Sequence, residues 1–119
     1  MAAIEDITGA QVNVLRPPYG STNETVKQVC RELGLVIANW NIDTEDWRTR
    51  DADAILNSVL KSARDGAIVL SHDLYPETAA AMERAVACLA ERGYQLVTVS
   101  ELLEARAEGG NPGQIYYAA

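Results

Sequence analysis

The stretch from residue 67 to residue 73, Ala-Ile-Val-Leu-Ser-His-Asp, indicates the class of fold. Its first four residues are apolar and show no polar alternation, which is typical of a strand buried on both faces of a parallel sheet. Three polar residues then end the run abruptly. The stretch therefore predicts a strand over Ala67–Leu70 whose carboxyl end carries His72 and Asp73.

Short apolar runs and amphipathic segments alternate along the rest of the chain. Further strands are predicted at Val12–Leu15, Leu35–Trp40 and Tyr94–Val99, and Ile115–Tyr117 adds either a short strand or a packed apolar end. Helices are predicted where apolar residues recur every three or four positions. One helix follows a capping box of Ser21 and Glu24 and ends at Gly34, and the others cover Asp51–Arg64, Glu77–Arg92 and Ser100 to about Arg106.

Strands that alternate with helices predict an α/β fold with parallel strands and right-handed crossovers. Four such units form half of an eight-unit barrel or a small open sheet. The length of 119 residues suits one small domain, so residues 1–119 are predicted to be a single domain.

Charge and composition exclude several classes of partner. The net charge is -7 and no run of Lys or Arg exists to neutralise phosphates, so nucleic acid is not expected to bind. No apolar run approaches ~18 residues, so no membrane span is predicted, and no signal peptide is visible. Cys30 and Cys88 sit among apolar residues at helical spacing and are interpreted as small buried hydrophobes.

The unusual residues follow three of the predicted strands. They are the segments Arg16–Gly20, Asp43–Trp47 and Ser71–Asp73. Active sites of parallel βα folds form at the carboxyl ends of the strands, so we expect the three segments to converge on one rim.

Each segment also has a structural interpretation. Arg16–Gly20 is compatible with a stiff turn, Asp43 and Asp46 with helix capping, and Trp47 with the core. His72 is the only histidine, and a lone histidine after a strand is more often structural than catalytic. A histidine beside acidic residues at a strand end is nevertheless a usual way to hold a proton donor near neutral pH.

Three ordered motifs carry a family resemblance. Arg16-Pro17-Pro18-Tyr19-Gly20, then Asp43 with Asp46-Trp47, then Leu70-Ser71-His72-Asp73 resemble the last three motifs of the NodB-type polysaccharide deacetylases, carbohydrate esterase family 4. The ending from Gly93 to Leu102 is similar to the final strand and helix of that family. The resemblance implies part of a distorted (β/α) barrel, namely the C-terminal half of the catalytic domain.

The resemblance also implies a role for each matching residue. His72 would be the general acid that protonates the leaving amine, and Asp46 would hold His72 and favour its charged form. Arg16 would orient the catalytic base, and the backbone N–H of Tyr19 would help to stabilise the oxyanion. Trp47 and Leu70 would wall the apolar pocket for the acetyl methyl group. Tyr19 and Trp47 are also candidates for stacking on sugar faces.

The chain departs from the family pattern in its metal ligands. The family uses an Asp-Asp pair and two histidines four residues apart, whereas this chain has no adjacent Asp pair and one histidine. These motifs belong N-terminal to Ile4, so the chain resembles a truncation, an internal-start product or one piece of a split domain. A divalent metal, Zn or Co, is expected in the complete family domain and none in this chain.

The activity implied is removal of acetyl groups from a polysaccharide such as peptidoglycan, chitin or xylan, with metal-activated water. We expect the chain to be inactive by itself and to need the missing N-terminal half of the domain or a second copy. The alternative is a non-catalytic carbohydrate-binding or assembly module. Members of this family usually act outside the membrane, but the compartment of this chain is not predicted.

Overall fold

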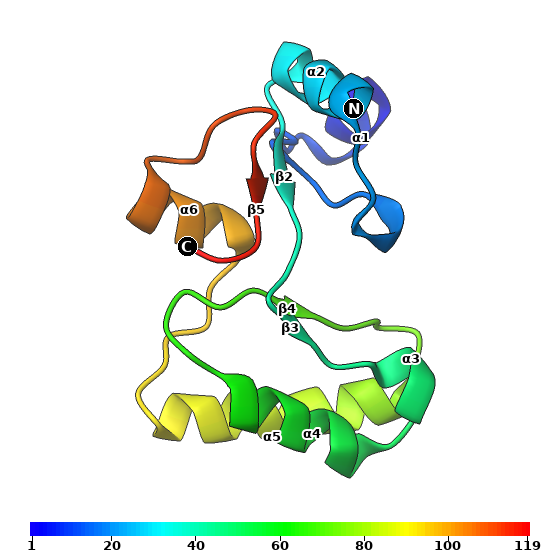
Figure 1. Ribbon diagram of the computed structural model, residues 1–119, viewed down its shortest axis with the longest axis vertical. Coiled ribbons are helices and arrows are strands. Elements are labelled where there is room, and N and C mark those ends of the chain that lie inside the picture. The colour runs from blue at the N-terminus through cyan, green and yellow to red at the C-terminus, as the bar shows by residue number, and fades with distance from the viewer. The chain divides into compact units, whose positions relative to one another are not determined.

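Two separate groups of parallel strands organise the chain, whose residues 1–119 are all described by a computed structural model (Figure 1). The chain divides into two units. Residues 1–39 and 99–116 form the first unit, and residues 40–98 and 117–119 form the second. The prediction of a single domain over residues 1–119 stays a prediction.

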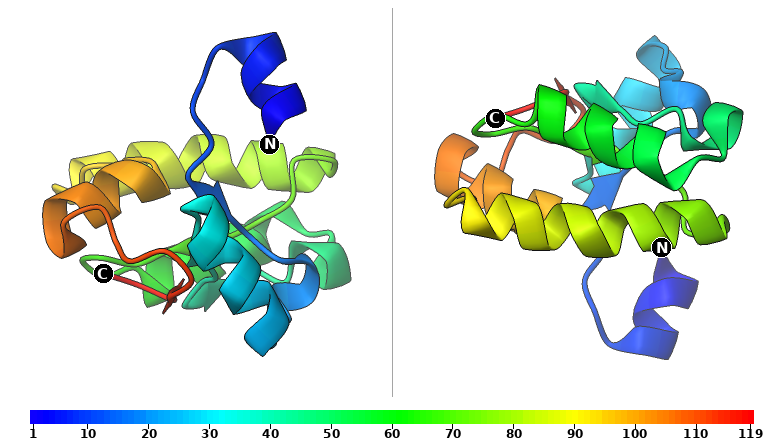
Figure 2. Two further views of the ribbon diagram at one scale, coloured as in Figure 1. Left: turned by 90° about the horizontal axis from the view of Figure 1, so that it is seen from above. Right: turned by 90° about the horizontal axis from the view of Figure 1, so that it is seen from below.

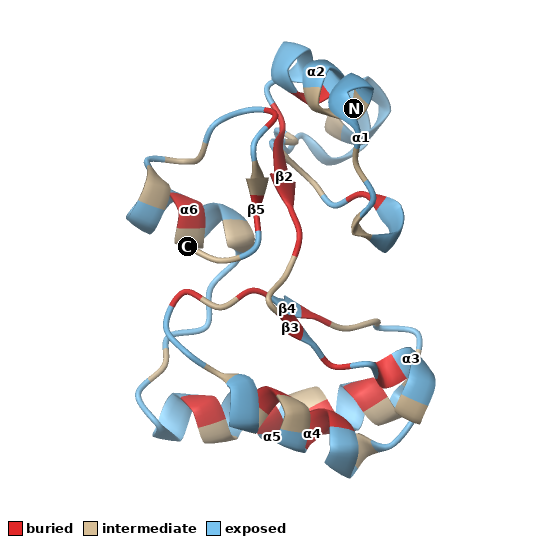
Figure 3. Cartoon of the chain, viewed as in Figure 1, coloured by how far each residue is buried: buried red, intermediate tan, exposed pale blue.

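The first unit contains a three-stranded sheet in the order β1-β2-β5. The strands are β1 (Val14–Leu15), β2 (Val36–Ala38) and β5 (Ile115–Tyr116). Both pairings are parallel. All three residues of β2 are buried, as expected of a central apolar strand (Figure 3). Of the two alternatives predicted for Ile115–Tyr117, the structure has the short strand, over Ile115–Tyr116.

Three helices and one 3₁₀ turn belong to the same unit as this sheet. They are α1 (Ala2–Thr8), η1 (Pro18–Gly20), α2 (Glu24–Leu33) and α6 (Val99–Ala107). The predicted capping box is wrong, because the side chain of Asn23, not Ser21, accepts the N–H of Val26 at 2.8 Å. Gly34 ends α2 in the left-handed conformation as predicted, with a φ of 73°.

The core of the first unit lies between α2 and the sheet. Cys30 on α2 is buried against Leu35 and Ile37, and partly buried apolar side chains complete the cluster. Cys30 is therefore a small buried hydrophobe, whereas Cys88 on α5 is only partly buried.

The strand predicted over Tyr94–Val99 is absent. Residues 94–98 form no regular element, and Val99 begins α6. This segment connects the second unit to the first. Tyr94 is anchored in the second unit, because its ring packs on the core there and its hydroxyl donates to the carbonyl of Ala63 at 3.3 Å. The place beside β2 belongs to β5, so no ladder partner holds the segment as a strand.

The second unit contains a two-stranded parallel sheet of β3 (Ile42–Asp43) and β4 (Val69–Leu70). The predicted strand Leu35–Trp40 stops early at Ala38, and β3 was not predicted. Asparagine side chains at this break form hydrogen bonds with backbone groups. Asn41 Oδ1 accepts the N–H of Ile68 at 2.9 Å, which replaces a ladder bond. The local competition of asparagine with the ladder explains the split.

Helices α3 (Asp46–Thr49), α4 (Ala52–Ser62) and α5 (Pro76–Glu91) complete the second unit. Asp51 caps α4 through Oδ1, which accepts the N–H of Asp53 at 2.9 Å and that of Ala54 at 3.3 Å. The predicted bounds of α4 and α5 are therefore close to the observed ones.

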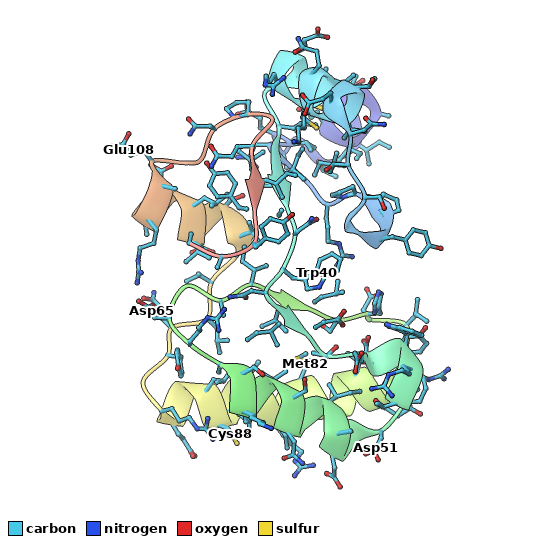
Figure 4. All side chains as sticks on the ribbon, viewed as in Figure 1. Trp40, Asp51, Asp65, Met82, Cys88 and Glu108 are labelled. Carbon is cyan, nitrogen blue, oxygen red and sulfur yellow. The ribbon has the colours of Figure 1, made fainter.

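Helices α4 and α5 lie side by side (Figure 2, right) and form the core of the second unit. Six buried side chains meet there: Ile55, Leu56, Val59, Ala81, Ala85 and Leu89. Met82, labelled in Figure 4, packs against this cluster. No helix of the chain has both the length and the apolar character needed to cross a membrane. The predicted α/β class with parallel strands is confirmed.

Candidate active site

The loops that follow β3 and β4 begin at the same end of their sheet. The two strands are parallel, with Ile42 opposite Val69 and Asp43 opposite Leu70. Asp46 therefore comes three residues beyond β3, and His72 comes two residues beyond β4. The predicted convergence of these two motifs is observed, although the acidic motif follows β3 and not the strand that was predicted before it.

Asp46 and His72 contact each other through two hydrogen bonds. The Nδ1 atom of His72 lies 2.8 Å from Oδ1 of Asp46. The backbone N–H of His72 donates to Oδ2 of Asp46 at 2.6 Å. The carboxylate of Asp46 thus fixes both the imidazole ring and the start of its loop.

Two further donors complete the surroundings of the buried Asp46 carboxylate. The backbone N–H of Trp47 donates to Oδ1 at 2.9 Å, and the hydroxyl of Thr78 donates to Oδ2 at 2.8 Å. Asp46 is 0% exposed. A carboxylate offers about four acceptor positions, so every one is occupied in the ionised form.

The hydrogen bonds keep Asp46 ionised in spite of its burial. Burial by itself raises the pKa of Asp46. The hydrogen bonds from the ring and the backbone of His72 and from Thr78, together with the charge of the imidazolium, outweigh that effect and hold the pKa below its ordinary value. Asp46 is therefore a carboxylate at neutral pH.

An ionised Asp46 decides which nitrogen of His72 can exchange protons. Because Oδ1 can only accept, Nδ1 carries the hydrogen, and Nε2 is the atom left for a reacting group. The His72 side chain is 33% exposed, so it is accessible to a ligand. The arrangement can deliver a proton from Nε2 and then keep the neutral ring in a single tautomer.

The aromatic ring of Tyr75 contacts the imidazole ring of His72. The two ring centroids are 6.1 Å apart with an interplanar angle of 67°. The guanidinium carbon of Arg50 lies 4.3 Å from the centre of the Tyr75 ring, and Nε of Arg50 is 3.6 Å from Oε2 of Glu77. A cation placed in this way over an aromatic face is attracted to it, so these residues restrict the position of Tyr75 beside His72.

Sequence reasoning missed Thr78 and Tyr75. The signal for Thr78 is its place on the apolar face of α5, where Ala81, Ala85 and Leu89 recur at helical spacing. A buried hydroxyl on such a face needs a hydrogen-bond partner. Nothing in the local pattern says that this partner is Asp46.

The two residues predicted to wall the acetyl pocket differ in exposure. Leu70 is 7% exposed, and its backbone carbonyl accepts the hydroxyl of Thr44 at 2.8 Å. Trp47, on α3 directly after Asp46, is 54% exposed. Their roles in substrate binding stay predictions.

Arg16 and Tyr19 belong to the first unit and are described within it. Arg16 directly follows β1 and is exposed. Tyr19 lies in η1 with a φ of 59°, in the left-handed region that non-glycine residues rarely adopt, and its side chain is 98% exposed. Such backbone strain recurs at functional sites. The roles predicted for these two residues stay predictions.

The residues of this chain do not fit a divalent metal site. No group of three or more His, Cys, Asp or Glu side chains gathers anywhere in the structure. Asp46 is not a free ligand, because both of its oxygens accept protein hydrogen bonds. No chemical step is therefore assigned to a metal held by these residues.

Comparison with known proteins identifies the family. The family model described as polysaccharide deacetylase matches residues 1–38. The peptidoglycan-N-acetylglucosamine deacetylase PgdA of Listeria monocytogenes is 46% identical over 100 residues, which cover 84% of this chain and 21% of PgdA. The structure of the peptidoglycan deacetylase PdaC from Bacillus subtilis matches with a TM-score of 0.81 and 36% identity over 90% of this chain and 52% of that one. The chain matches the C-terminal portion of a NodB-type polysaccharide deacetylase domain.

Another relative of the chain is named for a different glycan. The chitooligosaccharide deacetylase of Sinorhizobium fredii is 34% identical over 98 residues, which cover 71% of this chain and 46% of that protein.

The chain spans only part of its relatives: about a fifth of PgdA and about half of the PdaC structure. The structural match confirms the predicted fold class, in which the alternating βα units are part of the family's distorted barrel.

Proposed function

We propose that this chain supplies the proton-donor side of a polysaccharide deacetylase, which hydrolyses acetyl groups from an N-acetylated or O-acetylated polysaccharide. The observation that carries the proposal is the buried Asp46 carboxylate bonded to Nδ1 of His72 at 2.8 Å. This bond leaves Nε2 of a partly exposed imidazole as the proton-transfer atom.

The chemistry of amide hydrolysis requires such a group. The nitrogen of an amide leaves poorly until it is protonated, so a general acid is needed on that side of the scissile bond. Nε2 of the imidazolium gives its proton to that nitrogen as the carbon–nitrogen bond breaks. The neutral ring keeps its Nδ1 hydrogen on Asp46, so the donor stays in place throughout.

The other predicted site residues take the roles that the resemblance implies. Arg16 orients the catalytic base, and the backbone N–H of Tyr19 donates to the oxyanion. Trp47 and Leu70 line the pocket for the acetyl methyl group. Trp47 and Tyr19 are each exposed in their own unit, which supports the proposal that each side chain is accessible to a glycan.

Activation of water is the part of the reaction for which this chain has no fitting residues. The resemblance implies a divalent metal such as Zn or Co for that task, and no suitable ligand group exists here. We therefore propose that the chain is inactive by itself. Its partner in the reaction is the N-terminal half of the domain, which carries the metal ligands in this family. A second copy of the chain brings no such ligands, so it is proposed only as a partner that covers exposed strand edges and apolar helix faces.

The names of the relatives support N-acetylated glycans as substrates. They name peptidoglycan N-acetylglucosamine and chitooligosaccharides. The proposed substrate class is accordingly a polymer of N-acetylhexosamine such as peptidoglycan or chitin, with acetylated xylan as an O-acetylated alternative.

A grafted domain tests the proposal. It joins this chain to the part of Bacillus subtilis PdaC that the chain does not match. The assay measures acetate release with Zn²⁺ or Co²⁺ from N-acetylglucosamine oligomers, peptidoglycan and acetylated xylan. We expect the grafted domain to release acetate and the 119-residue chain by itself to release none. A folded but inactive grafted domain, or an active single chain, contradicts the proposal.

The exposed aromatic residues favour a second candidate, a carbohydrate-binding module without activity. Trp47 is 54% exposed and Tyr19 is 98% exposed, and flat aromatic rings commonly stack on sugar faces. Calorimetric titration with chitooligosaccharides distinguishes the two candidates. Binding that needs both rings, in a grafted domain that never releases acetate, favours the module.

A further inference from the structure

Thr78 is a buried polar side chain on the otherwise apolar inner face of α5. It is 3% exposed, and Ala81, Ala85 and Leu89 are the other buried residues of that face. Threonine hydroxyls in helices often bond to a carbonyl of the preceding turn. The hydroxyl of Thr78 donates to Oδ2 of Asp46 at 2.8 Å instead, across 32 positions of sequence.

We propose that Thr78 is a positioning residue of the Asp46–His72 pair, because its hydroxyl holds the Asp46 carboxylate in the orientation in which Oδ1 receives the Nδ1 hydrogen of His72. Its effect on catalysis rests on the function proposed above. Its effect on the geometry of the pair does not.

The four hydrogen bonds of Asp46 divide into two sets. Oδ1 accepts from the Trp47 backbone and the His72 ring, and Oδ2 accepts from the His72 backbone and Thr78. Two of these donors belong to His72 in the loop after β4, and a third is the backbone N–H of Trp47 in the four-residue helix α3. Thr78 is the only donor from a long helix, so it ties the carboxylate to the packed core of α4 and α5.

The hydroxyl of Thr78 also favours the charged state of Asp46. A donor to a carboxylate stabilises the ionised form, and such charge-assisted bonds are stronger than neutral ones. A protonated Asp46 has an O–H of its own and loses an acceptor position for its four donors. The ring of His72 is then no longer held to donation from Nδ1.

The charged groups near Asp46 leave the experiment simple to interpret. His72 is the only ionisable side chain that forms a hydrogen bond with Asp46. Arg50 at the C-terminal end of α3 forms an ion pair with Glu77 on α5. Glu45 forms an ion pair with Arg48. Removing one hydroxyl from Thr78 changes no charge in this set.

The chain offers a matched control for the loss of that hydroxyl. Thr44 is also 3% exposed and its hydroxyl also donates at 2.8 Å, but the acceptor is the neutral carbonyl of Leu70. Thr78→Val and Thr44→Val therefore each remove one buried hydroxyl, and the two lost hydrogen bonds have the same length. Only the first removes a donor from Asp46, and Thr78→Ser keeps that donor.

The experiment follows two signals by NMR in the 119-residue chain. The carboxyl carbon of Asp46, assigned by its loss in Asp46→Asn, reports protonation of that group. The ¹⁵N signals of the single histidine report its tautomer. We expect Thr78→Val to move the Asp46 transition to higher pH and to reduce the Nδ1–H population of His72. Thr78→Ser and Thr44→Val leave both signals as in the wild type.

Equal effects of Thr78→Val and Thr44→Val on stability, with both signals unchanged, overturn the inference and make Thr78 a structural hydroxyl. If Thr78→Val does not fold, exchange of the Thr78 hydroxyl proton in the wild type decides the matter. A proton protected until Asp46 titrates supports the inference, and one that exchanges freely overturns it.

Activity in the grafted domain separates this inference from the proposed function. Thr78→Val should lower turnover by about tenfold, because it removes a charge-assisted bond from the positioned carboxylate, and it should move the acid limit to higher pH. If the NMR signals change as expected while His72→Ala leaves turnover intact, the proposed function fails and the positioning role of Thr78 stands. If the NMR signals stay fixed while His72→Ala abolishes turnover, the positioning role fails and the proposed function stands.

Discussion

Asp46→Asn replaces one acceptor oxygen by an NH₂ group in a place where all four neighbours donate. If the NH₂ takes the position of Oδ2, it faces the backbone N–H of His72, which cannot reverse. If it takes the position of Oδ1, it faces the backbone N–H of Trp47, which cannot reverse either. Each orientation therefore leaves one backbone N–H without its partner.

The expected loss of stability follows from these bonds. A buried donor left without a partner costs about 1–3 kcal/mol. The remaining bonds change from charged, about 1.5–3 kcal/mol, to neutral, about 0.5–1.5 kcal/mol. Because the side chain is fully buried, we expect Asp46→Asn to lower the free energy of unfolding by about 3 kcal/mol. The orientation with NH₂ at Oδ1 also forces His72 into the opposite tautomer.

Urea unfolding at neutral pH, followed by tryptophan fluorescence, measures the difference. Asp51→Asn is the matched control, because Asp51 caps α4 from an exposed position and asparagine caps a helix about as well as aspartate. The control should change stability by less than about 0.5 kcal/mol. An Asp46→Asn variant as stable as this control refutes the account of the buried carboxylate.

The stability difference between the wild type and Asp46→Asn should depend on pH in a definite direction. The pKa of Asp46 is lowered in the folded chain, chiefly by its hydrogen bonds with His72 and Thr78 working against burial. Its contribution to stability is therefore fully present above the ordinary carboxyl pKa of about 4 and is lost as the pH falls through the lowered value. The stability difference between wild type and Asp46→Asn should be largest near neutrality and shrink in acid.

Three further outcomes are expected. In ¹⁵N NMR of the single histidine at high pH, Nδ1 should carry the hydrogen, and a signal dominated by the Nε2–H form contradicts the geometry of Asp46 and His72. In the grafted domain, Trp47→Ala should raise KM for chitooligosaccharides several-fold with a smaller change in kcat, whereas an unchanged KM removes this half-exposed ring from the binding surface. In sedimentation at micromolar concentration the chain should associate, because β1 is an edge strand and Val29 and Leu33 on α2 are about half exposed. A stable monomer counts against that expectation.

The parts of the fold that sequence predicts well have strong local signals. Helices α4 and α5 combine a regular apolar face with a capping Asp51 or a Pro76 at the first turn, so their ends lie within two residues of the prediction. β4 lies inside the predicted Ala67–Leu70 but covers only Val69–Leu70. Val69 is 39% exposed, so the predicted burial on both faces is wrong for this strand.

The parts that sequence predicts poorly depend on distant partners. The run from Tyr94 to Val99 has the composition of a strand, but β5 takes the place beside β2. β3 is only two residues long, and it exists because β4 pairs with it. Helix α1 carries no side-chain cap and no buried residue, so its pattern is weak.

The site residues likewise divide into those that local sequence predicts and those that depend on a partner distant in sequence. Asp46 and His72 were predicted because acidic and histidine residues at strand ends form a chemically meaningful set. Thr78 was not, because its partner is 32 residues away and a threonine on a helix has many local alternatives.

The central claim is that His72 delivers the proton to the leaving nitrogen, and its most direct test is the turnover of His72→Ala in the grafted domain. The assay measures initial rates of acetate release from N-acetylglucosamine oligomers across a range of substrate concentrations. General acid catalysis is typically worth ~10²–10⁴-fold, so kcat should fall by at least about a hundredfold while KM changes little. A kcat within a few-fold of the unmutated grafted domain contradicts the account.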